Sequence, residues 1–280
     1  MHFADVVERR FMVHVVRRTN MLFDTRFAMP GRPRGLVDVF AVRRGWLEVD
    51  GVRTVGPAVW ILDEGEFALG ATAPPHLRIG GEVCDVVDVQ LARADVRRPI
   101  GVRHGPVPLA PAAWRAFDAA LDTATSTAPT ATIAPTMAAL IATLGDAGVV
   151  APDLAATLTV DEPAAFRRLE AAMAPLLADF TGTMAVDAVA EAAGVSARQL
   201  SRDVAELAAT FGLIGDGLRD SSLRLRLRIA VLLLSVPDVT ATMVARHLGY
   251  SSLPAFATAL RNAGLPSPQE IQHAVRGAVA

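Results

Sequence analysis

The feature that most constrains the fold is a helix–glycine–helix pattern in residues 239–268. Apolar residues recur at helical spacing on both sides of Gly249, which predicts two short helices joined by a tight turn. Glycine suits that turn because a positive φ is cheap only without a Cβ. Ser251 or Ser252 can cap the second helix, and the prolines that close this stretch are expected to stop it. Such a pair is typical of a helix–turn–helix.

The same pattern occurs once upstream, in residues 184–207. Gly194 supplies the turn and Ser196 the cap, and a buried stripe is expected from Leu200, Val204 and Leu207. Residues 223–235, between the two copies, are long and apolar enough for a connecting helix. Two copies joined by a helix are more specific than one, and a helix–turn–helix usually places its second helix in a DNA major groove.

The last third of the chain, about residues 180–273, resembles the AraC/XylS family of bacterial transcription regulators. The residues that carry the resemblance are Ser196, Leu200 and Arg202 in the first copy, Arg226-Leu227, Ala230 and Leu233-Leu234 in the connecting helix, and Val244-Ala245, Gly249-Tyr250, Ser252, Phe256 and Ser267-Pro268 in the second copy. The resemblance implies a DNA-binding domain of two helix–turn–helix units, which follows a cupin-like sensor domain.

The pattern departs from the family at several places. Thr258 stands where a cation is usual, and Val204-Ala205 replaces an aromatic and cationic pair. Gly264 comes one place early, and residues 208–220 are longer than the family norm. The framework positions therefore match better than the contact positions do.

Two recognition helices are expected, at residues 196–202 and 251–261. Arg198, Gln199 and Arg202 are the predicted base-reading residues, because Arg can bond guanine and Gln can bond adenine in bidentate fashion. The alternative for Arg202 is an ion pair with Glu206. The predicted DNA-binding set is Ser196, Ala197, Arg198, Gln199, Ser201, Arg202, Ser251, Ser252, Leu253, Thr258 and Arg261.

Residues 36–95 predict a series of short strands, with Asp50-Gly51 as the strongest hairpin signal. The predicted strands are residues 36–42, 46–49, 52–55, 58–62, 66–69, 76–79 and 83–91, with a turn at 43–45. Many short strands at regular spacing favour a barrel or jelly roll. A small-molecule effector would contact Phe40, Trp46, Trp60, Phe67 and His76, although core packing is the favoured role for each one individually.

An enzyme is not expected. The six histidines form no His-x-His pair, and the chain has neither a phosphate-binding glycine loop nor a nucleophile elbow. Catalytic residues, metal ligands and cofactors are therefore predicted to be none. A cupin enzyme with an accessory domain is a third, minor hypothesis.

Amphipathic helices are expected between the strands and the helix–turn–helix copies. Residues 110–121 would bury Trp114, Phe117 and Leu121, and further helices are predicted at 137–144 and 164–180, with a loop at 123–132. By resemblance these helices favour a dimer interface; the alternative is that they pack on their own barrel. The fold class is α+β: a cupin-like barrel (1–110), a helical connector (111–180) and a double helix–turn–helix domain (181–280).

Charge gives a weak electrostatic signal for nucleic acid. The net charge is −2 with 27 basic residues, all of them Arg, and from residue 181 onward nine Arg stand against eight acids. The run Arg224, Arg226 and Arg228 can contact phosphate or pair with Asp216 or Asp220. No run of about 18 apolar residues, no signal-peptide pattern and a single cysteine, Cys84, together predict a cytoplasmic protein without a membrane span.

The favoured hypothesis is a ligand-responsive, sequence-specific DNA-binding transcription regulator. Its expected partners are double-stranded DNA, an unknown small-molecule effector and a second copy of the chain, with RNA polymerase as a further candidate. The alternative is a chain that keeps the fold but has lost DNA binding and serves as a ligand-binding or protein-interaction module. Thr258, the Val204-Ala205 pair and the small basic excess motivate that alternative.

Overall fold

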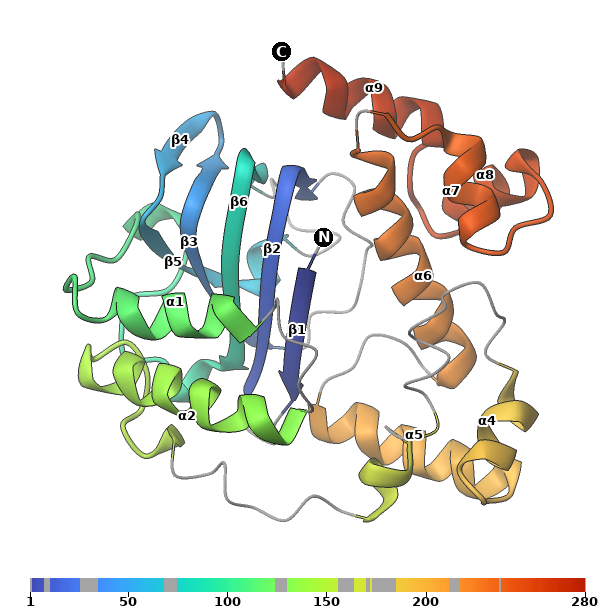
Figure 1. Ribbon diagram of the computed structural model, residues 1–280, viewed down its shortest axis with the longest axis horizontal. Helices are drawn as coiled ribbons and strands as arrows, with labels where there is room; N and C mark the ends of the chain where they lie inside the picture. The colour runs from blue at the N-terminus through green and yellow to red at the C-terminus, as the bar shows by residue number, and fades with distance from the viewer. Residues whose placement is uncertain are drawn as a thin grey trace. The chain divides into compact units, whose positions relative to one another are not determined.

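The computed structural model divides into two compact units (Figure 1). The sheet unit contains residues 1–25 and 32–160, and the helical unit contains residues 26–31 and 161–280. The structure describes residues 2–7, 11–25, 35–67, 75–123, 130–155, 164–169, 172, 185–211, 217–236 and 238–279. The expected domain boundaries near 110 and 180 stay predictions, since a compact unit can contain more than one folding domain.

Six antiparallel strands build the sheet unit. They are β1 (His2–Val7), β2 (Phe11–Asp24), β3 (Leu36–Val49), β4 (Val52–Val55), β5 (Ala58–Asp63) and β6 (Leu77–Ala92). The strand order is β1-β2-β6-β3-β4, and β5 pairs with the first half of β3. The predicted hairpin is confirmed: Asp50 and Gly51 both have positive φ, and Val49 pairs with Val52 across the turn.

Two pairs of predicted strands each form one long strand. The strands predicted at 36–42 and 46–49 are both part of β3, and those predicted at 76–79 and 83–91 correspond to β6. The register of β3 against β6 shifts between Val42 and Arg44 and again between Arg44 and Trp46, so the expected turn at 43–45 is a bulge inside β3. Gly45 lies at this bulge with φ 96°, and a Cβ there would meet the Gly80 carbonyl oxygen at 2.6 Å. The bulged strands therefore approach too closely for any other residue at position 45.

The predicted barrel is not confirmed. Over the described strands the sheet stays open, because no pairing joins β1 to β4 or β5. The strand predicted at 66–69 is also wrong in its first half, since Glu64–Phe67 forms a short 3-10 helix; residues 68 and 69 lie outside the described part. The long strands β1 and β2 precede the region where the sequence predicted strands.

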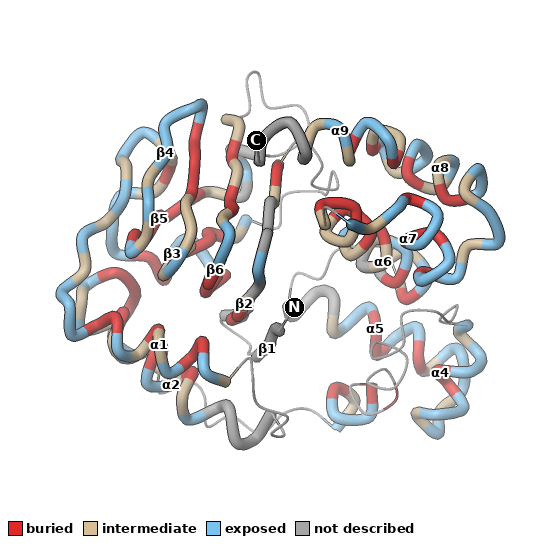
Figure 2. Tube along the Cα trace, turned by 45° about the horizontal axis from the view of Figure 1, so that its top comes forward, coloured by how far each residue is buried: buried red, intermediate tan, exposed pale blue. Residues whose placement is uncertain are grey.

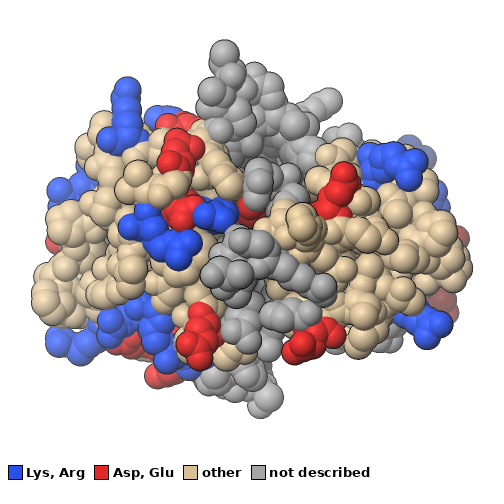
Figure 3. Space-filling view, turned by 90° about the horizontal axis from the view of Figure 1, so that it is seen from above, with Lys and Arg blue, Asp and Glu red and all other residues tan. Residues whose placement is uncertain are grey.

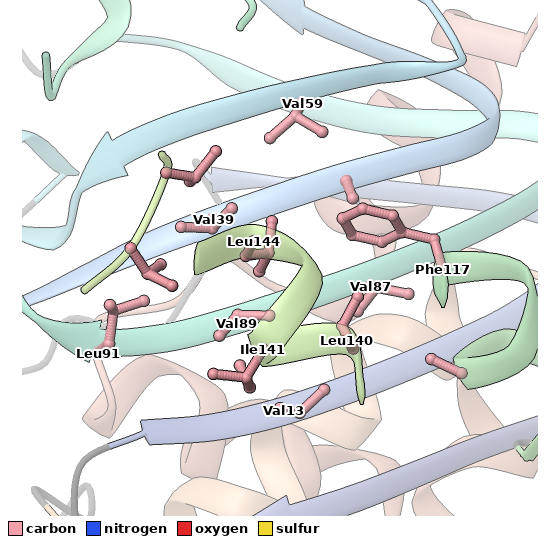
Figure 4. Packing of buried hydrophobic residues seen from close by; sticks show 14 of the residues in the cluster. Val13, Val39, Val59, Val87, Val89, Leu91, Phe117, Leu140, Ile141 and Leu144 are labelled. Carbon is pink, nitrogen blue, oxygen red and sulfur yellow. The ribbon is translucent and has the colours of Figure 1, made fainter. Parts of the chain in front are cut away.

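Helices α1 (Trp114–Thr123) and α2 (Thr130–Asp146) pack on one face of the sheet. Phe117, Leu121, Leu140 and Leu144 meet strand residues such as Val39 in one cluster (Figure 4). Trp114, Phe117 and Leu121 are buried, as the helical spacing predicted. Close packing of about twenty apolar side chains is the main stabilising contribution in this unit. Of the loop expected at 123–132, residues 124–129 lie outside the described part, whereas Thr123 ends α1 and residues 130–132 begin α2, so the prediction is wrong at both ends.

The helical unit contains both predicted helix pairs. Its elements are α4 (Val186–Ala192), α5 (Ala197–Phe211), α6 (Leu218–Leu234), α7 (Ala241–His247), α8 (Leu253–Asn262) and α9 (Pro268–Val279). The long α6 is the expected connecting helix. Helix α8 ends at Asn262, before Pro266, and Pro268 begins α9, where Ser267 and Glu270 form a reciprocal capping box. Of the helix predicted at 164–180, the described residues 164–169 and 172 are helical.

The described residues before α4 belong to the helical core. Leu169 and Ala172 pack with Val189 of α4 and with Leu200 and Val204 of α5. The predicted stripe of α5 is thus buried, with Leu207 partly so. Helix α5, the recognition helix predicted in the first copy, therefore packs against Leu169 and Ala172, which precede α4.

Candidate nucleic-acid interface

The turn before α5 and the turn before α8 each contain a glycine with positive φ and a serine that caps the following helix, as the sequence predicted. Gly194 has φ 65° and Gly249 has φ 76°, both in the left-handed region that favours glycine. The Ser252 hydroxyl accepts a hydrogen bond from the Ala255 backbone N–H at 3.3 Å, and Ser196 accepts one from Gln199 at 3.2 Å. These caps fix where α8 and α5 begin and therefore which side chains face outward.

Helix α5 divides into a buried side and an exposed side. Leu200, Asp203 and Val204 are buried, whereas the positions on the opposite side are exposed (Figure 2). The exposed side chains are Ala197, Arg198, Ser201, Arg202, Ala205 and Glu206. Ser201 is already engaged, because its hydroxyl donates to the Ala197 carbonyl at 2.9 Å. The guanidinium groups of Arg198 and Arg202 are therefore available to a ligand on this side, together with the carboxylate of Glu206.

Arg198 and Arg202 lie one helical turn apart, so their side chains share a face. Within the described residues neither arginine makes an ion pair, and the alternative pairing of Arg202 with Glu206 does not occur. Two cations at this spacing repel each other by a few tenths of a kcal/mol in water. An acceptor between them, such as a base edge or a phosphate, would remove that repulsion.

Gln199 is held in a different way from its neighbours. Its side-chain Nε2 donates to Asp203 Oδ1 at 2.7 Å, and Asp203 also pairs with Arg168 at 3.4 Å. Asp203 is only 4% exposed, so water barely reaches its carboxylate, which depends on these two donors. Reading adenine through Gln199, as the sequence predicted, would require this hydrogen bond to break.

The sequence analysis missed this three-residue cluster. The spacing of Gln199 and Asp203 at i and i+4 is a signal that could have indicated the first hydrogen bond. Arg168 lies 35 positions upstream of Asp203 and has no local pattern that points to it.

Helix α8 exposes a less polar surface than α5. Its outward residues are Pro254, Ala255, Thr258, Arg261 and Asn262, and Leu253 is half-buried. Phe256 and Leu260 are fully buried and hold the opposite side in the core. Ser251 and Ser252 are exposed in the turn. The predicted residues of the second copy thus share one exposed region, where Arg261 carries the only charge among the described residues of α8.

The arginines of α6 have mixed environments. Arg224 pairs with Asp220 at 2.9 Å, which is the internal alternative that the sequence left open. The Arg226 guanidinium lies 5.9 Å from the ring centroid of Tyr250. Burial raises the pKa of the Tyr250 hydroxyl, and the positive charge of Arg226 opposes that rise. Tyr250 also packs against Phe256 of α8, so Tyr250 contacts both α6 and α8 from the turn between α7 and α8.

Surface charge shows no continuous basic region on the face drawn in Figure 3, where Arg and acidic side chains form small groups separated by other residues. An interface with DNA would therefore depend on a few local cations, since the formal excess of the C-terminal third is a single charge.

The predicted effector residues do not all lie together. Phe40 and Trp60 are register partners on β3 and β5 and belong to one apolar cluster, on the face opposite α1 and α2. The Trp60 ring nitrogen is buried without a hydrogen-bond acceptor among the described residues. His76 instead contacts Asp24 through Nε2 at 2.9 Å. The side chain of Phe67 lies outside the described part.

Trp46 lies apart from Phe40 and Trp60. The Arg53 guanidinium stacks 3.8 Å from the Trp46 ring centroid, and Arg78 lies 5.9 Å from it. Simple alternation along β3 would have placed Trp46 on the face of Phe40. The bulge at Arg44 reverses the alternation, so that Leu47 and not Trp46 joins the cluster of Phe40.

A shallow groove of about 530 Å³ opens elsewhere on the sheet unit. Pro57, Pro106, Pro108, Leu109 and Trp114 line it together with Arg43, which bonds Asp118. None of the predicted effector residues borders this groove. Among the described residues no group of His, Cys, Asp or Glu has the arrangement of a metal site, and no helix has both the length and the apolarity to cross a membrane.

Comparison with known proteins gives only remote structural likeness. No family model and no curated protein matches the chain. It is similar to solved structures of ToxT from Vibrio cholerae. A 1.65 Å structure of that protein is 8% identical, with 94% of this chain and 98% of the other covered and a TM-score of 0.40.

The ligand-bound ToxT structures give similar values. An unsaturated fatty acid complex is 10% identical over 95% of this chain and 96% of the other, with a TM-score of 0.38. A complex with (E)-4-(8-methylnaphthalen-1-yl)but-3-enoic acid is 8% identical over 94% and 98%, with a TM-score of 0.40. A likeness this loose assigns no residue and no ligand to this chain.

Proposed function

We propose that the chain is a sequence-specific DNA-binding transcription regulator whose activity responds to a small molecule. The observation that carries the proposal is the pair of capped helix–turn–helix units, with Arg198 and Arg202 exposed and without carboxylate partners on α5. In such a unit the second helix enters the major groove, and its N-terminal side chains approach the base edges. Arg198 lies in the first turn of α5, which suits that role.

The effector would bind to the sheet unit on the face that carries Phe40 and Trp60. Support comes from the buried Trp60 N–H, which has no acceptor among the described residues and would gain one from a ligand oxygen or nitrogen. Binding there can alter DNA affinity only if the effector prefers one arrangement of the chain over another. A homodimer, a contact with RNA polymerase and a cytoplasmic location complete the proposal.

A direct test is an electrophoretic mobility shift with the full chain and DNA from its own upstream region. The proposal expects a shift that survives nonspecific competitor. With about four phosphate contacts, the affinity should fall by on the order of 10²-fold between about 50 and 200 mM salt. A folded protein that gives no competitor-resistant shift would contradict the proposal.

The second candidate is a protein that keeps this fold without reading DNA. The observation in its favour is the exposed surface of α8, where Ala255 and Thr258 stand beside a single cation, Arg261. Such a surface could contact another protein. DNA binding that does not change with salt, or that is equal for all sequences, would support this candidate over the regulator.

A further inference from the structure

The two recognition helices present different chemistry to the same kind of groove. On α5, Arg198 and Arg202 are exposed cations that make no ion pair among the described residues. On α8, the corresponding exposed residues at the N-terminal end are Pro254, Ala255 and Thr258. This difference determines which base each helix can recognise, provided that the chain binds DNA as proposed above.

Helix α5 is suited to guanine. A guanidinium donates two parallel hydrogen bonds to guanine O6 and N7, which no other base offers in the major groove. The side chain that would favour adenine, Gln199, has its Nε2 donating to the buried carboxylate of Asp203. Because Asp203 is also held by Arg168, turning Gln199 outward would remove one of two donors from a buried charge.

Helix α8 is suited to thymine. The hydroxyl oxygen of Ser252 accepts the cap hydrogen bond from the Ala255 N–H, and the exposed side chains of Pro254 and Ala255 in the first turn offer only carbon atoms to a groove. The Ala255 and Thr258 methyl groups are exposed one turn apart on the same helix face. The thymine C5 methyl is the one apolar group on a base edge in the major groove.

We infer that the two units read different bases: α5 selects guanine through Arg198 and Arg202, and α8 selects thymine through the methyl groups of Ala255 and Thr258. The inference rests on the proposed DNA binding. It predicts a binding site with a guanine-containing half and a thymine-containing half, about one turn of DNA apart. Guanine dominates the selectivity, since a bidentate pair discriminates by about 5- to 150-fold and one buried methyl by about 4-fold.

The guanine half is tested by selecting binding sites from random DNA with the full chain, then repeating the measurement with Arg198→Ala and Arg202→Ala. Alanine removes the donors that would reach guanine O6 and N7. The expected result is a guanine-containing consensus in the unmodified chain and a loss of guanine preference in the variants, with a smaller loss of affinity for nonspecific DNA. Arg219→Ala, an exposed arginine on α6, is the matched control and should keep the preference.

The thymine half is tested with synthetic sites in which single thymines are replaced by uracil, which removes only the C5 methyl. Affinity should fall about 4-fold for substitutions in the half that α8 contacts and should not change in the guanine half. Thr258→Ser should reduce the difference between thymine and uracil, since the Ala255 methyl group remains. Melting curves establish that each variant is folded.

The outcomes separate the inference from the proposed function. No competitor-resistant DNA binding by the folded chain would overturn both. Specific binding that keeps its guanine preference in both alanine variants, or that does not change with the uracil substitutions, would overturn the inference alone and would not contradict the proposed regulator.

Discussion

The arginines of the sheet unit that bond buried carboxylates contrast with the exposed arginines of α5 and α8. In the sheet unit, arginines hold carboxylates of the same unit: Asp85, which is 1% exposed, bonds both Arg17 and Arg44, and Glu48 bonds both Arg53 and Arg78. In the helical unit, Arg198, Arg202 and Arg261 are exposed, and the described residues provide them with no carboxylate.

The contrast shows that whether each arginine is already paired says more about its ability to bind a ligand than the net charge does. The C-terminal third has a formal excess of only one positive charge, which by composition argues against nucleic-acid binding. A guanidinium that is already bonded to a buried carboxylate is unavailable to a ligand, whereas an exposed and unpaired one is available. The free arginines of α5 therefore say more about function than the sum of charges does.

The largest expected effect concerns packing within one unit. Phe117→Ala removes a fully buried ring and should lower the free energy of unfolding of the sheet unit by about 3–5 kcal/mol. All three tryptophans belong to this unit, so urea unfolding followed by tryptophan fluorescence reports it selectively. Phe256→Ala in the helical unit is the matched control and should mainly shift the loss of helical circular dichroism. A cost below about 1 kcal/mol for Phe117→Ala would show that the core is poorly packed.

The next effect tests the internal role of arginine in the sheet unit. Asp85→Asn removes the buried charge that Arg17 and Arg44 share, and should cost about 2 kcal/mol; the arginines are partly solvated, which keeps the loss below that of a fully buried pair. The control is Asp122→Asn, an exposed partner of Arg17, which should cost less than about 0.5 kcal/mol. Equal costs for the two variants would break the contrast between structural and free arginines.

The cap of α8 gives an effect of intermediate size. Ser252→Ala removes the acceptor of the Ala255 N–H and should destabilise the helical unit by about 1 kcal/mol. Ser251→Ala, its exposed neighbour in the same turn, should leave the melting temperature unchanged. A larger cost for Ser251 would place the start of α8 elsewhere.

The pH dependence of the free energy of unfolding tests the ion pairs of Glu48 in the sheet unit. Burial raises the pKa of Glu48, but the hydrogen bonds from Arg78 and Arg53 outweigh it, and the net pKa is lowered. Because the folded pKa is below the ordinary 4.5, Glu48 stabilises the sheet unit above that value, and the contribution is lost as pH falls through the folded pKa. Glu48→Gln should flatten the acid side of the stability curve. An unchanged curve would mean that other carboxylates dominate there.

The smallest expected effect on stability comes from the recognition helix. Arg202→Ala removes an exposed side chain without an ion pair among the described residues, so the free energy of unfolding should change by less than about 0.5 kcal/mol. Thermal unfolding of the purified variant measures it. A loss above about 1 kcal/mol would indicate a structural role and weaken the assignment of Arg202 to DNA.

Local signals in the sequence were enough for the helical unit. Each helix pair is specified by a glycine at positive φ and a serine cap within a few residues, and the apolar spacing located the buried residues of α5 and α8. The start of α9 at Pro268 was missed, although the capping box of Ser267 and Glu270 is itself a local pattern.

The sheet unit was harder to predict because its determinants are distant in sequence. Residues of β2 pair with residues of β6 that are 54 to 80 positions away, from Asp24–Arg78 to Phe11–Leu91. The bulge in β3 depends on Gly45 meeting Gly80 and Gly81. That bulge moved Trp46 away from Phe40, which no alternation rule along β3 alone could show. At the interface, exposure of Arg198 followed from helical periodicity, but the restraint on Gln199 depends on Arg168, which precedes its helix.

The central claim is that the free arginines of α5, and not the partnered arginines of the sheet unit, contact DNA. Dissociation constants for DNA from the chain's own upstream region should be measured at two salt concentrations for three proteins: the unmodified chain, Arg198→Ala with Arg202→Ala, and Arg53→Ala with Arg93→Ala. In the sheet unit Arg53 pairs with Glu48 and Arg93 pairs with Asp63. The account predicts that the α5 variant binds at least about tenfold more weakly and that the sheet-unit variant is unchanged. Equal affinity for all three proteins, or a loss confined to the sheet-unit variant, would contradict it.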